Sequence, residues 1–195
     1  MNSVITDIHK IESVAGTHYG IQAECLNTGK IEGLFDVWEK NGPASLVYSD
    51  SKKNKAVGDF IANNGMEVTP VVPAFFNRCY GRFVDIDWGV VVLCLDDFDG
   101  VGPIYNKLRY FRDERPHTPV ILTSSAFKSH DLSQERLSIC DLSIRLPLEP
   151  GSEESLFQAA GQNNMIWMER LAGLEKVRMA KSPKVKLKRS RRTRS

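Results

Sequence analysis

The residues most able to do chemistry form an acidic turn near the middle of the chain. Asp96, Asp97 and Asp99 follow an apolar run at residues 90–95 and precede Gly100. Carboxylates grouped in this way can hold a divalent cation or accept a transferred group. The competing interpretation is that they are solvated loop residues with no reaction to perform.

Other candidate groups carry weaker signals. Ser124 and Ser125 are potential nucleophiles, but no histidine lies at a useful motif spacing, so we interpret them as hydrogen-bonding residues at a strand end. The four histidines also lack metal-ligand spacing. No C-x-x-C pair is present, and we expect reduced thiols at the four cysteines: Cys25, Cys79, Cys94 and Cys140. The sequence therefore predicts no metal site, no cofactor and no catalytic residue.

The elements that would position the acidic turn alternate between strand and helix. The run at residues 90–95 is unbroken and apolar, as in a strand buried on both faces of a parallel sheet. Four further strands are predicted, at residues 44–48, 67–72, 120–123 and 141–146. Helices are predicted at residues 52–64, 103–112 and 131–139, and from Ser152 onward. We therefore expect an α/β fold with a five-stranded parallel sheet and helices on both faces.

Length and composition fit one domain with appendages. The chain has 195 residues, of which 42% are hydrophobic, so it can bury a core. We expect four parts: an unassigned N-terminal extension at 1–42, a main domain at 43–163, a C-terminal helix extension at 164–180 and a disordered basic tail at 181–195. No run approaches the about 18 apolar residues that span a bilayer, and no secretory signal pattern is present, so a cytoplasmic protein is expected.

Several motifs resemble the receiver family of two-component response regulators. Asp87 is similar to the Asp that opens the family's third strand, and Asp99-Gly100 is similar to the Asp-Gly pair after its phosphorylation loop. Ser124 falls where the family has Thr or Ser. Residues 140–147, C-D-L-S-I-R-L-P, are similar to its Ala-Asp-Asp-Tyr-Leu-x-Lys-Pro motif. The resemblance implies a receiver or flavodoxin-like sheet with strand order 2-1-3-4-5, and a cis bond before Pro147.

The family's reactive positions are not kept in this chain. Counting back seven from Asp99 puts Val92 at the phosphoacceptor position, and Leu146 replaces the family's Lys. Valine is not a nucleophile and leucine carries no charge, whereas phosphorylation needs both a nucleophile and cations around the phosphoryl group. The degenerate positions are Ser49, Asp50, Val92, Ser124 and Leu146. The resemblance thus implies a phosphorylation-defective pseudo-receiver, a signalling protein in two-component or transcriptional regulation that acts by protein–protein interaction and not as an enzyme.

Two alternatives stay open. In the first, the protein is a phosphoaccepting receiver that uses Asp96 or Asp97, with Asp50 holding Mg²⁺. This alignment needs a shorter loop and still lacks the Lys. In the second, the protein associates with nucleic acid through its basic tail. For partner contacts, the resemblance implies the face around residues 125–146.

The tail concentrates positive charge. Of the 26 basic residues, eight lie in residues 181–195, which contain no acidic residue, so 18 basic and 24 acidic residues remain in residues 1–180. The eight are Lys181, Lys184, Lys186, Lys188, Arg189, Arg191, Arg192 and Arg194. Such a tail either binds nucleic-acid phosphates without sequence preference or only solubilises the protein.

The predicted helix extension carries an apolar stripe. Trp167, Leu171 and Leu174 lie at i, i+4 and i+7, which places them on one helix face. This stripe can pack on its own domain, contact a protein partner or form a homodimer.

Overall fold

The computed structural model describes residues 31–49 and 51–181, and its centre is a five-stranded sheet. All four strand pairs are parallel, and the strand order is β2-β1-β3-β4-β5. The strands are β1 (Ala44–Val47), β2 (Val68–Val71), β3 (Val90–Cys94), β4 (Val120–Ser124) and β5 (Leu142–Arg145). The predicted fold class and strand order are therefore confirmed.

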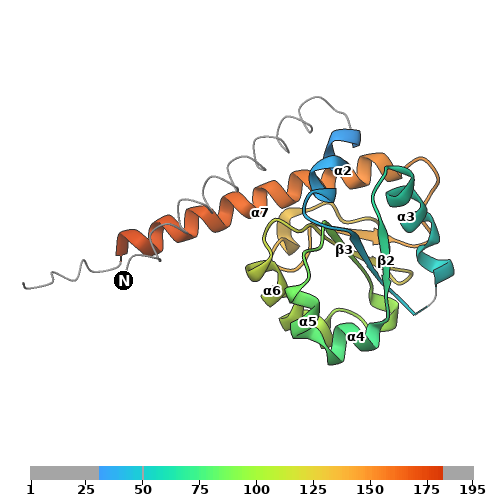
Figure 1. Ribbon diagram of the computed structural model, residues 1–195, viewed down its shortest axis with the longest axis horizontal. Coiled ribbons are helices and arrows are strands. Elements are labelled where there is room, and N and C mark those ends of the chain that lie inside the picture. The colour runs from blue at the N-terminus through green and yellow to red at the C-terminus, as the bar shows by residue number, and fades with distance from the viewer. Residues whose placement is uncertain (1–30, 50, 182–195) are drawn as a thin grey trace, which may run out of the picture.

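Helices cover both faces of the sheet. Their bounds are α2 (Ile31–Glu39), α3 (Ser51–Asn63), α4 (Pro73–Arg78), α5 (Tyr80–Asp85), α6 (Tyr105–Glu114) and α7 (Glu153–Lys181). Buried side chains of α2, α3 and α7 form one core cluster with the sheet, and those of α4, α5 and α6 form a second cluster. Figure 1 shows these two groups of helices on opposite sides of the strands.

Strand β3 contributes to both clusters. Val90 and Val92 belong to the cluster under α2, α3 and α7, whereas Val91 and Leu93 belong to the cluster under α4, α5 and α6. This alternation is the period of two that a pleated strand imposes. All five residues of β3 are buried, which confirms the central, two-sided strand that the apolar run predicted.

The core extends N-terminal to the boundary predicted at Pro43. Phe35 and Trp38 of α2 are buried, with ring centroids 5.6 Å and 6.3 Å from the ring of Phe157 in α7. Helix α2, which lies in the predicted N-terminal extension, is therefore part of the packed body. The remainder of the predicted N-terminal extension, residues 1–30, lies outside the described residues.

One predicted helix is wrong. Residues 131–139 have an apolar pattern and a capping Asp, but this stretch contains only the single 3₁₀ turn Gln134–Arg136. Asp131 instead pairs antiparallel with Ser143 of β5, through backbone hydrogen bonds of 2.8 and 3.1 Å. Its carboxylate accepts a hydrogen bond from the Ser133 amide, which is a local turn contact. The connection from β4 to β5 consequently has no α-helix.

Helix α7 follows the cis Leu146–Pro147 bond, which the receiver resemblance had predicted. The helix has 29 residues and is about 43 Å long. Figure 1 shows its C-terminal part running beyond the sheet. In that part the side chains of Leu174, Val177 and Met179 are exposed.

Candidate functional site

Two neighbouring carboxylates follow β3 in a 3₁₀ turn, Leu95–Asp97, at the carboxyl edge of the sheet. Asp96 faces β4: its carboxylate accepts hydrogen bonds from the Ser124 and Ser125 hydroxyls, both at 2.6 Å, and from the Ser125 amide at 3.1 and 3.2 Å. Both carboxylate oxygens of Asp96 are therefore engaged by the segment that leaves β4. Hydrogen bonds to a charged acceptor are among the stronger ones in proteins.

Asp97 faces the opposite direction. Its Oδ2 accepts a 2.7 Å hydrogen bond from the amide of Ser49, which lies just after β1. The two adjacent carboxylates thus connect the end of β3 to the segments that follow β4 and β1. This arrangement holds three loops of the carboxyl edge in fixed relative positions.

A buried polar group lies directly beneath this edge. The Thr123 hydroxyl donates a 2.8 Å hydrogen bond to the Asn54 side-chain oxygen, so β4 is joined to the first turn of α3. Cys94, the last residue of β3, is buried beside them. Burial raises the pKa of the Cys94 thiol, and a hydrogen bond with the Asn54 side chain acts in the opposite direction. Sequence reasoning missed Asn54, because no motif connects it with residues 40 or 69 positions away.

The predicted phosphorylation positions are only partly brought together. Ser49 and Ser124 lie at the carboxyl edge, each within hydrogen-bonding distance of one carboxylate. Val92 instead lies in the middle of β3 with its side chain in the core. The strand ends two residues later, at Cys94. Leu146 is buried, and its amide donates a 2.9 Å hydrogen bond to the Ser124 carbonyl. Asp50 lies outside the described residues.

The motif spacing places the acceptor seven positions before Asp99. In the structure β3 ends at Cys94, five positions before Asp99, and Asp99 adopts a left-handed backbone with φ of 55°. Val92 therefore lies inside the strand, whereas Asp96 lies in the 3₁₀ turn that follows the strand and is partly exposed.

The donor set does not resemble a divalent-cation site. Hard cations need several free oxygen ligands, whereas the oxygens of Asp96 already accept hydrogen bonds from hydroxyl and amide donors. Among the residues that the structure describes, no group of three or more His, Cys, Asp or Glu side chains is placed to hold a metal ion.

The predicted interaction helix is divided between two environments. Trp167 packs on its own domain, where its indole donates a 3.4 Å hydrogen bond to the Arg112 carbonyl and its ring centroid lies 5.1 Å from the Arg112 guanidinium carbon. Leu171 is partly buried, and Leu174 is 65% exposed. Only the end of the stripe is therefore free for a partner. The predicted nucleic-acid-binding side chains of residues 181–195 lie outside the description.

The described cysteines are free thiols, as predicted. Cys140 is buried, which raises the pKa of its thiol to about 11. A raised pKa lowers the thiolate fraction, and the thiolate is the species that reacts.

Iodoacetamide at mildly alkaline pH is therefore expected to leave Cys94 and Cys140 unmodified in the folded protein. Cys79 is partly exposed and serves as the internal control that reacts. Peptide mass spectrometry after labelling with and without guanidinium measures each site. Labelling of Cys140 at the rate of Cys79 in native buffer would contradict the burial seen here.

No protein-family model matches the chain, and no curated protein was found to be related to it. Of the helices in the described part of the chain, none combines the length and apolar character that crossing a membrane requires.

Proposed function

We propose that this protein is a cytoplasmic signalling regulator whose receiver-like domain works through protein–protein interaction without being phosphorylated. The observation that carries the proposal is the Asp96 carboxylate, whose two oxygens are both engaged by Ser124 and Ser125. Asp96 is the carboxylate best placed to react, because it follows directly from the central strand. Its lone pairs are occupied by donors from its own chain.

Phosphorylation of Asp96 is expected to be unfavourable. A phosphoryl group on Asp96 would displace charge-assisted hydrogen bonds that are each worth about 1.5–3 kcal/mol. At the end of β5, where the receiver resemblance calls for a Lys, the chain has the buried Leu146. An aliphatic side chain cannot compensate the charge of a phosphoryl group. A receiver-like domain that is not phosphorylated would present one conformation to its partner at all times.

Incubation with acetyl phosphate and Mg²⁺ is accordingly expected to give no acid-labile phosphoryl adduct by intact-mass spectrometry. Asp96→Ala and Asp97→Ala are the matched variants, since they remove neighbouring carboxylates with different partners. A stoichiometric adduct that disappears only in Asp96→Ala would establish the alternative, a phosphoaccepting receiver.

Binding to a protein partner is tested in a separate experiment. Cross-linking of the tagged full chain in cells should recover the same partners whether or not the phosphodonor is supplied. Recovery that depends on the phosphodonor would contradict phosphorylation-independent binding. The transcriptional or two-component setting follows from the resemblance and would be identified by those partners.

A further inference from the structure

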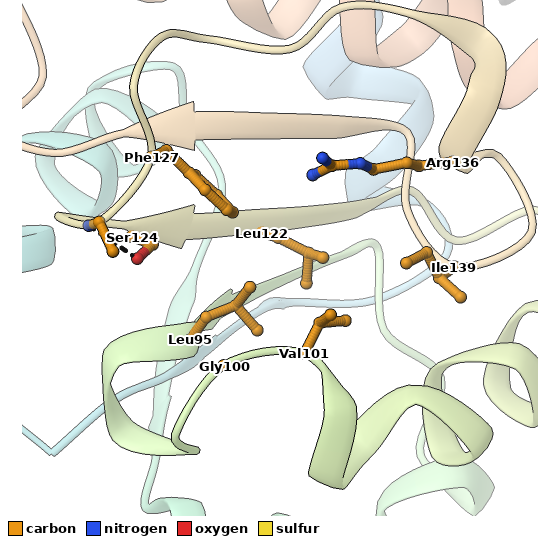
Figure 2. A pocket seen from close by; sticks show the side chains of 9 residues that line it. Leu95, Gly100, Val101, Leu122, Ser124, Phe127, Arg136 and Ile139 are labelled. Carbon is orange, nitrogen blue, oxygen red and sulfur yellow. Dashed lines mark hydrogen bonds between the residues drawn. The ribbon is translucent and has the colours of Figure 1, made fainter.

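A cavity of about 350 Å³ lies between the segments that leave β3 and β4. Its lining is Leu95, Gly100, Val101, Leu122, Ser124, Ala126, Phe127, Arg136 and Ile139. Figure 2 shows Leu95 and Val101 on one side, Phe127 and Arg136 extending toward each other on the opposite side, and Leu122 between them. The cavity is on the sheet face that also carries α4, α5 and α6.

The cavity exists because the β4–β5 connection lacks a helix. In the other crossovers of this sheet a helix packs on the strands: α3 after β1, α4 and α5 after β2, and α6 after β3. After β4 the chain covers Leu122 and Ile139 only with a loop, the Phe127 ring and the stem of Arg136. Leu122 and Ile139 are buried, and the accessible apolar lining comes from Val101, Ala126 and Phe127. This apolar lining lies next to the charged side chain of Arg136.

Arg136 is the only charged residue in this lining. Its Nε lies 3.3 Å from Asp131 Oδ2, and the side chain is 49% exposed. Its two η nitrogens donate no hydrogen bond within residues 31–49 and 51–181. A guanidinium with free donors beside an apolar surface suits a ligand that combines a planar anion with an apolar body.

We propose that this cavity binds a small amphipathic anion, with an aliphatic or aromatic body in the apolar part and a carboxylate on Arg136. The volume is at the lower end of ligand pockets. At roughly 30 Å³ per water-sized unit it accepts a body of about a dozen non-hydrogen atoms. Decanoate has this size and chemistry and is the probe for the test.

The position of the cavity gives such binding a regulatory consequence, which rests on the proposed function. Leu95 and Ser124 both line the cavity, and Asp96, next to Leu95, accepts a hydrogen bond from Ser124. A ligand in the cavity would stabilise the arrangement that Asp96 already holds. Ligand occupancy would then reinforce the single conformation on which the proposed function rests, without a phosphoryl group.

The test is isothermal titration of the full-length protein with decanoate, and with decanol and decylamine as neutral and cationic counterparts. We expect saturable binding of decanoate near one equivalent, weaker binding of decanol and none of decylamine. Arg136→Gln should weaken decanoate about tenfold or more, as expected for loss of a charge-assisted contact, and leave decanol unchanged. Arg145→Gln, an exposed cation on β5 outside the lining, should change decanoate affinity less than about twofold.

A second variant tests the apolar part. Val101→Phe places a ring in the cavity and should abolish binding of both decanoate and decanol, with the fold checked by circular dichroism. Equal effects of Arg136→Gln and Arg145→Gln, equal affinity for decanol and decanoate, several equivalents bound, or no binding would each overturn the proposal. The phosphorylation assay is independent of all of these outcomes: an adduct on Asp96 would refute the proposed function while leaving decanoate binding intact.

Discussion

Arg112→Ala is expected to lower the free energy of unfolding by about 3–5 kcal/mol, because it leaves a buried carboxylate without its counter-charge. The Arg112 η nitrogens lie 2.8 and 2.7 Å from the two oxygens of Asp141, and both side chains have no solvent exposure. Arg112 also donates hydrogen bonds to the carbonyls of Thr118 and Leu137, each at 3.3 Å. The pair thus joins α6 to the start of β5.

Asp141 is ionised at neutral pH in this environment. Burial raises the pKa of its carboxyl to about 6, and the Arg112 guanidinium and the Val120 amide act in the opposite direction. Removal of Arg112 takes away a stabilising cation and leaves the cost of burial. The loss in free energy of unfolding is therefore larger than the net contribution of the Arg112–Asp141 ion pair to stability.

Urea denaturation at neutral pH measures the effect. Lys55→Ala is the control, because its partner Asp59 is an exposed neighbour on α3, and its loss is expected to cost at most about 1 kcal/mol. The double variant Arg112→Met, Asp141→Leu removes both charges and should recover most of the stability lost in Arg112→Ala. Similar losses in the double variant and the single variant would show that packing, and not the unpaired charge, causes the effect.

Gly42→Ala is expected to destabilise the protein by at least about 3 kcal/mol, through overpacking and backbone strain together. Gly42 connects α2 to β1 with φ of +135°, a backbone conformation that side chains rarely adopt. A Cβ there would lie 1.9 Å from the Asp87 carbonyl oxygen. The backbone contact cannot be relieved by a side-chain rotation, so the α2–β1 turn must move away from the segment before β3.

Gly81→Ala is the matched control for this prediction. Gly81 lies in α5, and a Cβ added to it would meet nothing within 4 Å. Alanine favours helix by up to about 1 kcal/mol over glycine, so this variant should be as stable as the parent or slightly more stable. Both are compared by urea denaturation and by the near-ultraviolet signal of buried Trp38. Equal stability of the two variants would contradict the close approach of Gly42 and Asp87.

The receiver resemblance and the apolar pattern of the chain were together sufficient to predict the parallel sheet. The run at residues 90–95 contains no polar residue, and a strand of this kind is stable only when both faces are covered. Its position as the middle strand therefore followed from composition alone. The strand order and the cis bond before Pro147 came from the motif resemblance, and the structure has both.

The candidate site was predictable only in outline. Asp96 and Asp97 follow β3 and Ser124 ends β4, and the carboxyl ends of parallel strands meet at one edge of the sheet, so the predicted sheet is consistent with their proximity. The sequence does not show which carboxylate faces which strand, because adjacent residues in a 3₁₀ turn point in different directions. The motif spacing placed the acceptor position at Val92, and the structure shows this residue in the core, two positions before the end of β3.

The remaining features depend on contacts between distant segments. Arg112 and Asp141 are 29 residues apart, and neither position carries a local signal for an ion pair. The pattern at residues 131–139 favours a helix, but the backbone of Asp131 is paired with Ser143 instead. The cavity at Arg136 lies beside this connection, which has no α-helix. Local patterns report which side of an element is buried, whereas these features depend on how the loops close over the sheet, and only the tertiary structure contains that information.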